Sequence, residues 1–472
     1  MAAFMRQPRL ATAVSAARWQ HSKSIAPAPP LVSLLDLELD RVQAQLRSLG
    51  LPRYRTEQLW RAALRAEPPC ESFSDLAQLS SRERKALAAS FAPLRQSTVL
   101  KEECAADGVV KWLIGVPRGG GGSGSGGGGS VNGDVAGSEV SGNLEVEGKL
   151  SAGSPRSVQV EAVYIPEPRR GARGSGTLCV SSQAGCSLAC TFCSTGQQEF
   201  SGGLGAGAIV EQFLQARARV AALGAPRLTH IVFMGQGEPL LNWRSVRTAI
   251  RAFTHEWGCA LPPRRITVST AGVAPLIAAV ATDTPGVRLA VSLHAPSDAL
   301  RSKIMGVNSR WPIAEVLRAC QAYIDARLAA RRGADGGSEG DEDSEDEGER
   351  LDSRPPAPGS RHVRVTFEYV LLEDVNDSAA LADELAALLL AGIRDAGRHA
   401  HVNLLNFHEW SGAPYRRSSD AAAAAFRNAL ERRGIRATVR RTRGLDVQGA
   451  CGQLRSSERL KEARVATVPS AN

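Results

Sequence analysis

The feature that most constrains the fold is a regular alternation of strand-like apolar runs and helical stretches from Thr177 onward. Six such alternations predict a parallel sheet covered by helices, either a doubly wound sheet or a partial barrel. In both architectures the functional site lies at the carboxyl ends of the strands. The predicted strands are 177–181, 230–234, 265–269, 288–293, 363–372 and 402–407, and the predicted helices are 208–222, 243–254, 273–281, 313–330 and 379–391.

The segment before this alternation reads as a separate unit. With 472 residues the chain is long enough for two or three domains. Residues 31–117 predict a small N-terminal helical domain, with one helix ending near Gly50, others at 54–65 and 81–92, and a strand at 109–116. We expect this domain to assist the larger unit that follows.

Two insertions and a tail divide the rest of the chain. Residues 119–130 are nine Gly and three Ser, and the Gly/Ser-rich composition indicates a disordered insertion over 118–157. The main domain is then expected at 158–454, interrupted at 333–360 by an acidic, Pro-rich segment that reads as a disordered surface loop. Residues 455–472 form a C-terminal tail.

The charge balance points to a polyanionic partner. The chain carries 57 Lys and Arg against 48 Asp and Glu, but ten of the acids lie in residues 335–352. Without that segment the basic excess is 18, which suggests RNA or DNA as a partner. The alternative is ordinary solubility charge. A cluster of arginines between Arg416 and Arg443 is the candidate contact for a phosphate backbone.

The first 30 residues resemble a targeting segment. They contain four basic residues and no acid, and they lack the long apolar core of a secretory signal. We interpret residues 1–30 as an organelle transit peptide, for a chloroplast or a mitochondrion. The alternative is a disordered basic tail on a cytoplasmic protein. No apolar run reaches the roughly 20 residues of a membrane-spanning helix, so no membrane association is expected.

Three of the nine cysteines crowd into eight residues directly after the first predicted strand. Cys186, Cys190 and Cys193 form a C-x3-C-x2-C loop, which can ligate three irons of a 4Fe-4S cube and leave the fourth iron without a protein ligand. A zinc site, which usually gathers four ligands as two short pairs, is the alternative. Cys179 lies on the strand and would have to fold back to serve as a fourth ligand.

The cysteine loop, with Phe192 before its last cysteine, resembles the cluster-binding motif of the radical S-adenosylmethionine superfamily. The surrounding segments narrow the resemblance to the RNA adenine-C2 methyltransferases, and it covers about residues 31–454 apart from the two insertions. It implies a partial (β/α)6 barrel preceded by the small helical domain. The segments that carry it are Cys179-Val-Ser-Ser-Gln-Ala-Gly-Cys186, Met234-Gly-Gln-Gly-Glu-Pro-Leu-Leu-Asn242, Ser292-Leu-His-Ala-Pro296, Gly412-Ala-Pro-Tyr415, and Arg441-Thr-Arg-Gly444 with Ala450-Cys-Gly-Gln453.

The resemblance assigns roles to individual residues. It implies that the cysteine loop holds a 4Fe-4S cluster, that Cys451 is methylated as an intermediate, that Cys179 is its partner thiol, and that Glu161 accepts a proton. His408 stands where the family usually has Asn as a last cofactor contact, and Asn406 lies two residues earlier, so that contact stays open. The residues implied to bind S-adenosylmethionine are Gly237, Glu238, Ser269, Ser292, Leu293 and His294.

The implied reaction uses two molecules of S-adenosylmethionine. One methylates Cys451; the second is cleaved at the cluster, and its radical activates the S-methyl group for addition to adenine. Loss of an electron and a proton, then attack by Cys179, releases the methylated RNA and leaves a disulfide.

The implied partners are ribosomal RNA, with tRNA as a further substrate, and an external electron donor. The resemblance also implies that the helical domain at 31–117 is an accessory domain that binds RNA, and we expect a monomer. Methylation at carbon 8 of adenine, or a non-catalytic zinc and RNA-binding protein, are the alternatives.

Overall fold

A computed structural model describes residues 31–67, 69–117, 157–167, 174–334, 363–440, 443–444, 446–449 and 453–454. The proposed transit peptide at 1–30, most of both insertions, the tail at 455–472 and Cys451 lie outside the described residues. Within these ranges no helix has the length and the apolar character needed to cross a membrane.

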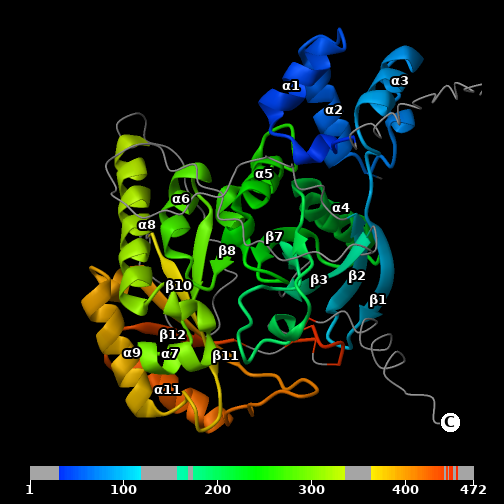
Figure 1. The fold of residues 1–472 in the computed structure, drawn as a ribbon. Helices are drawn as coiled ribbons and strands as arrows, with labels where there is room; N and C mark the ends of the chain where they lie inside the picture. Colours follow the sequence, from blue (N-terminus) through cyan, green and yellow to red (C-terminus); the bar gives the residue numbers. More distant parts are fainter. Residues whose placement is uncertain are drawn as a thin grey trace, which may run out of the picture.

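A ten-stranded sheet forms the centre of the molecule (Figure 1). Its order is β1-β2-β3-β4-β7-β8-β9-β10-β11-β12, antiparallel from β1 to β4 and parallel from β4 to β12. The predicted α/β fold with a parallel sheet is therefore confirmed. The strands are β1 (Thr98–Cys104), β2 (Val110–Pro117), β3 (Ser157–Glu167), β4 (Ser175–Cys179), β7 (Leu228–Phe233), β8 (Ile266–Thr270), β9 (Arg288–Ser292), β10 (Val365–Leu371), β11 (Ala400–Asn406) and β12 (Arg436–Val439).

Helices connect the parallel strands and cover the outer face of the curved sheet (Figure 1). The helix predicted at 243–254 has the observed bounds, and the others differ by a few residues at their ends. The helices of this part are α4 (Ala206–Ala222), α5 (Trp243–Thr254), α6 (Ala274–Asp283), α7 (Asp298–Ile304), α8 (Ile313–Ala334), α9 (Ala379–Gly392), α10 (Ala396–His399) and α11 (Asp420–Arg432).

The first strands of the sheet have two differently packed faces. Val110 and Trp112 of β2 belong to the main hydrophobic core, together with Phe213 of α4 and Phe253 of α5. The alternate residues face the other way, because successive side chains of a strand point to opposite sides. A small second cluster, which we term the inner cluster, lies on that side and contains Ala105, Val109, Val163, Cys179 and Leu454. The concave face of the sheet thus begins at this cluster.

Three helices precede the sheet: α1 (Leu39–Ser48), α2 (Tyr54–Arg65) and α3 (Ser81–Ser90) (Figure 1). They confirm the helices expected in this region. The strand predicted at 109–116 is β2, which belongs to the main sheet rather than to the helical unit, as does β1. The helical unit itself therefore ends before Thr98.

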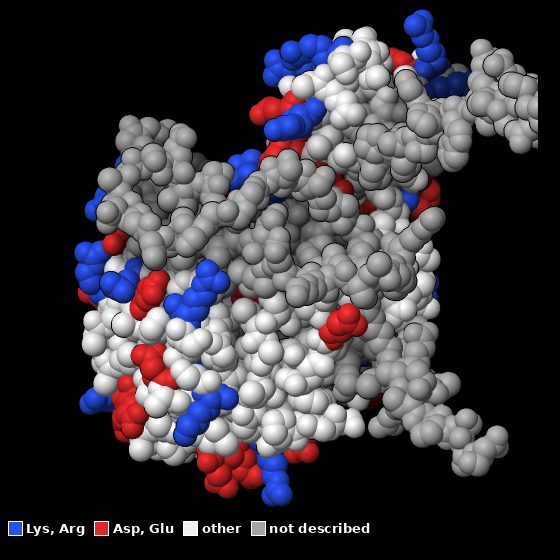
Figure 2. Space-filling view, viewed as in Figure 1, with Lys and Arg blue, Asp and Glu red and all other residues white. Residues whose placement is uncertain are grey.

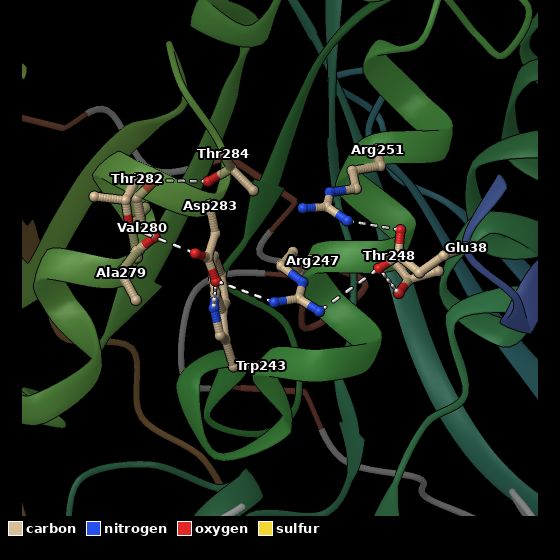
Figure 3. Close-up of polar contacts among 10 residues, drawn as sticks. All are labelled: Glu38, Trp243, Arg247, Thr248, Arg251, Ala279, Val280, Thr282, Asp283 and Thr284. Atoms are coloured by element: carbon tan, nitrogen blue, oxygen red, sulfur yellow. Dashed lines mark hydrogen bonds and ion pairs between the residues drawn. The ribbon is translucent and has the colours of Figure 1, made fainter. Parts of the chain in front are cut away.

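An ion-pair network joins the helical unit to the outer helices (Figure 3). Glu38, directly before α1, accepts a hydrogen bond from Thr248 at 2.8 Å and pairs with Arg251 at 2.9 Å. Arg247, on the same face of α5, bridges to Asp283 at the end of α6 at 3.3 Å. These contacts fix the helical unit on α5.

Candidate active site

The three clustered cysteines lie on a loop that a short hairpin closes at its base. Strand β5 (Gln183–Ala184) pairs with β6 (Gly202–Gly203), and a turn in which the Cys193 N–H donates to the Cys190 carbonyl at 3.1 Å folds the loop between them. Burial raises the pKa of Cys186 to about 12, and burial also raises the pKa of Cys190, with the neighbouring thiols adding to both shifts. The three thiols could all ionise only if a bound group supplied positive charge.

Glu238 lies beside this loop, just past the end of β7. Gly237 precedes it with a φ of 95°, and a Cβ there would lie 2.4 Å from Gln183 Cβ, so only glycine allows this approach. The carboxylate of Glu238 accepts hydrogen bonds from the N–H groups of Leu240 at 3.0 Å and Ala271 at 2.7 Å. Burial nevertheless raises its pKa to about 7. A buried carboxylate of this kind is suited to a cationic partner such as an ammonium group.

The ends of β8 and β9 place the next predicted residues at the same edge of the sheet. Ser269 belongs to β8, and Ser292 is the last residue of β9. The backbone N–H of Leu293 donates to the carbonyl of Glu368 on β10 at 3.0 Å, which continues the strand pairing for one more residue. The structure therefore brings these three predicted residues to the carboxyl edge beside Glu238.

His294 adopts a left-handed backbone conformation with a φ of 60°. Its Nδ1 accepts a hydrogen bond from the Val370 N–H at 2.9 Å, and its ring packs edge-on against Phe192 of the cysteine loop at 4.8 Å. Burial lowers the pKa of His294 to about 3, so the imidazole is neutral. The residue ties the cysteine loop to the ends of β9 and β10.

A buried arginine behind these strand ends was not among the predicted residues. Arg301 of α7 donates to the carbonyls of Ala271 at 2.5 Å, Ser292 at 3.1 Å and Leu293 at 3.1 Å, and to the Asn308 side chain at 2.9 Å. Burial lowers its pKa to about 10. Arg301 therefore holds the carboxyl ends of β8 and β9 together. The sequence carries no local signal for it, because its acceptors come from distant segments.

Cys179 and Glu161 share the concave face of the sheet. Cys179, the last residue of β4, is 7% exposed and pairs with Val163 of β3. Glu161 lies two residues before Val163 in β3. Because β3 is antiparallel to β4, Glu161 is nearer the carboxyl edge of β4, where the Ser181 hydroxyl donates to the Glu161 backbone carbonyl at 2.6 Å. The predicted proton acceptor thus lies near the predicted thiol, one step closer to the site.

Cys451, the cysteine predicted to be methylated, lies outside the described residues, but the described chain on either side of it is anchored. The N–H of Gly444 donates to Asp107 in the β1–β2 turn at 2.9 Å, and a Cβ at Gly449 would lie 3.5 Å from Val163. Leu454 belongs to the inner cluster with Cys179, and its carbonyl accepts hydrogen bonds from Thr195 and Gln198 behind the cysteine loop. Gly449 thus approaches the strand partner of Cys179, and Leu454 shares a cluster with Cys179 itself.

Comparison with known proteins identifies the fold and the chemistry of this edge. Residues 180–332 match the model of the radical SAM superfamily. The chain is 35% identical to a dual-specificity RNA methyltransferase RlmN of Methylocella silvestris, over 92% of this chain and 94% of the relative. It is 34% identical to the corresponding protein of Xanthobacter autotrophicus, over 98% of this chain and 97% of the relative.

This chain belongs to the RlmN family of radical SAM enzymes. A crystal structure of a radical SAM methyltransferase from Sphaerobacter thermophilus is also similar, with 33% sequence identity and a TM-score of 0.68 over 90% of this chain and 99% of that one. Membership in the superfamily implies a 4Fe-4S cluster and S-adenosylmethionine.

Several groups at the carboxyl edge fit these cofactors. The side-chain amide of Gln236, the Ser194 hydroxyl and Asn406 Oδ1 are buried and have no hydrogen-bond partner within the described part of the chain. Unsatisfied buried polar atoms mark places where a ligand or water completes the hydrogen bonding. They lie after β7, on the cysteine loop and at the end of β11, around the same edge as Glu238.

The arrangement of the three thiols is compatible with a four-iron cube. Among the residues that the structure describes, no three His, Cys, Asp or Glu side chains converge on a position for a single metal ion. A four-iron cube does not need such convergence, because each thiolate binds a different iron.

The arginines near the C-terminus divide between the two edges of the sheet. Arg416 and Arg417 follow β11 and lie at the carboxyl edge, where the Glu373 N–H donates to the Arg416 carbonyl at 3.1 Å. Arg432 ends α11 and Arg436 begins β12, so both lie at the opposite edge. The sequence cluster therefore splits: Arg440, which follows the last residue of β12, lies at the carboxyl edge with Arg416 and Arg417, whereas Arg432 and Arg436 do not. On the face in Figure 2, basic side chains also gather over the N-terminal helices.

Proposed function

We propose that this protein methylates carbon 2 of adenine in large-subunit ribosomal RNA, with tRNA as a second substrate. The observation that carries the proposal is the three-cysteine loop at the carboxyl edge beside Cys179, in a chain 35% identical to a dual-specificity RNA methyltransferase over 92% of its length. Carbon 2 of adenine has no lone pair, so a polar methyl transfer to it is unfavourable and a cofactor must supply the difficult chemistry.

The strand ends are proposed to hold the cofactors. Cys186, Cys190 and Cys193 would bind the 4Fe-4S cluster, and Glu238 with the Gly237 backbone would bind the amino group of S-adenosylmethionine. Bound there, these groups supply the methyl group and the one-electron chemistry that activates it, with two S-adenosylmethionine molecules per turnover and an external electron donor. The remaining contacts proposed for S-adenosylmethionine are Ser269, Ser292, Leu293 and His294.

A positively charged partner for Glu238 is supported by its surroundings. Two backbone N–H groups hold its carboxylate in place, but burial raises its pKa to about 7. An ammonium group in contact with the carboxylate would favour the charged form. Binding of the cofactor and ionisation of Glu238 should therefore support each other.

Two thiols are proposed to carry the methyl group and release the product. Cys451 would accept a methyl group on its sulfur, because a thiolate is a strong nucleophile. After that carbon has bonded to carbon 2 of adenine, Cys179 would attack the Cys451 sulfur: the disulfide forms as the sulfur–carbon bond breaks, and the released carbon takes a proton to become the methyl group of the RNA. The anchors on both sides of Cys451 support this pairing. Cys451 is two residues from Gly449, a span of at most about 7 Å, and Gly449 packs against Val163, the strand partner of Cys179.

Glu161 is proposed to accept the proton that leaves carbon 2. It is 3% exposed and lies on the same face as Cys179, nearer the carboxyl edge. An unstacked adenine would have to enter from that edge, since carbon 2 is not accessible within a stacked helix. Arg416 and Arg417 at the same edge would contact the RNA backbone.

The test is nucleoside analysis of RNA after reaction with the reconstituted enzyme. We expect 2-methyladenosine as the product, whereas 8-methyladenosine or unmodified adenosine would contradict the proposal. The Cys179→Ala variant should stay covalently attached to its RNA, because no thiol releases the adduct. Cys70→Ala, in the helical unit, is the matched control and should turn over as the wild type does.

A further inference from the structure

A row of paired residues crosses the first strands of the sheet and ends at Cys179. Glu103 of β1 pairs with Lys111 of β2, Lys111 pairs with Val163 of β3, and Val163 pairs with Cys179 of β4. Directly paired residues of adjacent strands share one face of a sheet. Because Val163 and Cys179 belong to the inner cluster, Lys111 and Glu103 lie on the concave face as well.

Lys111 is a buried cation on this face. It is 8% exposed, and its Nζ lies 3.2 Å from Glu103 Oε2 and 3.4 Å from Glu161 Oε1. Glu161 lies two residues from the direct strand partner of Lys111, and a side chain as long as lysine spans that diagonal. A charged group in such a place is retained only when it is paired, since an isolated buried charge is very costly.

We propose that Lys111 is a positioning residue that keeps the Glu161 carboxylate ionised and directed toward the carboxyl edge, ready for the proton of adenine carbon 2. This inference rests on the proposed function, in which the C2–H bond of the RNA adduct breaks, its electron pair stays on the adenine and its proton goes to Glu161. Lys111 transfers no proton itself. It acts through Glu161 alone.

The second carboxylate explains how one cation can serve a group that changes charge. Before proton transfer Lys111 lies between two carboxylates, Glu103 and Glu161. After transfer Glu161 is neutral, and Lys111 still has Glu103 as its partner. The ammonium group is therefore compensated at both stages, so Glu161 can gain and lose a proton without leaving a buried unpaired lysine.

The test separates the two halves of the reaction in single-turnover experiments. Lys111→Met should still form the methyl group on Cys451, a step that does not use Glu161. It should release methylated RNA at least about tenfold more slowly, a smaller loss than the roughly 100-fold minimum typical of a general base, because Lys111 only positions that base. The covalent protein–RNA adduct should accumulate. Lys111→Arg, which keeps the charge, should recover most of the release rate.

A double variant tests whether Lys111 acts through Glu161. If it does, Lys111→Met combined with Glu161→Gln should be no slower than Glu161→Gln alone, because residues that act as one unit are not additive. A further tenfold loss in the double variant would overturn the proposal. So would a loss of Cys451 methylation that parallels the loss of release in Lys111→Met, since that pattern indicates a purely structural role.

The outcome also separates this inference from the proposed function. If Glu161→Gln releases methylated RNA as fast as the wild type, the proposed role of Glu161 is wrong. If Glu161→Gln releases it slowly but Lys111→Met releases it at the normal rate, only the proposed role of Lys111 is wrong. Thermal unfolding of each variant serves as the folding control. Should Lys111→Met not fold, Lys111→Met/Glu103→Gln, which also removes the charge of the second carboxylate that Lys111 contacts, takes its place in the same assay.

Discussion

Replacing Glu238 by Gln should change how the stability of the cofactor-free protein depends on pH. Glu238 is 3% exposed, and burial raises its pKa from 4.5 to about 7. Between these values the folded state binds a proton that the unfolded state has lost, so the contribution of this group to stability is full below pH 4.5 and is lost as the pH rises to 7. A shift of this size corresponds to about 3 kcal/mol.

The measurement is the free energy of unfolding of both proteins in urea, from pH 4.5 to pH 8. A second buried group also titrates in this range, so the difference in unfolding free energy between the two proteins is more informative than the pH curve of either one. The pKa of His294 is lowered from 6.5 to about 3, so its contribution to stability increases as the pH rises through this window and opposes that of Glu238 from pH 4.5 to 6.5. Subtracting the two curves cancels His294.

The wild type should therefore lose about 3 kcal/mol relative to Glu238→Gln between pH 4.5 and pH 8. The Gln amide has one acceptor oxygen and so loses one of the two hydrogen bonds from Leu240 and Ala271. This loss shifts the difference in unfolding free energy by the same amount at every pH, so it does not affect the dependence on pH. A flat difference for Glu238→Gln would refute the reasoning that burial dominates at this carboxylate.

Three further predictions concern cofactor and RNA binding. Cys193→Ala should abolish the visible absorbance and the bound iron of the anaerobically purified protein, and retention of the cluster would contradict its proposed role. Asn406→Ala should weaken binding of S-adenosylmethionine, measured by calorimetry, about fivefold, which is the value of one hydrogen bond. The reason is that Asn406 Oδ1 has no partner within the described chain. His408→Ala should bind S-adenosylmethionine as the wild type does. Arg416→Ala should reduce the slope of log K for RNA against log salt by about 1, whereas Arg436→Ala at the opposite edge should leave it unchanged, and equal effects would contradict the division of the arginines.

The parallel part of the sheet could be predicted because its strands are short apolar runs bounded by turn residues. The strand β12 was missed, since its four residues lie between charged segments and give no apolar run. The pairing of β2 with β3 was also not predictable, because about forty residues separate them and no local pattern indicates the contact.

In the candidate site, too, only part of the arrangement could be predicted from the sequence. The cysteine loop is recognisable from spacing alone, since three soft ligands in eight residues have few other uses. Arg301 and Lys111 could not be found this way, because an isolated Arg or Lys in a sequence reads as a surface residue. Their burial depends on carbonyls and carboxylates from distant segments, such as Ala271 and Glu161.

The central claim is that Cys451 carries the methyl group to the RNA, and peptide mass spectrometry tests it most directly. Protein produced with its cluster intact and supplied with S-adenosylmethionine should carry one methyl group on the peptide containing Cys451, and that group should disappear when RNA is added together with a reductant. A Cys451 that stays unmodified while the RNA becomes methylated would contradict the account.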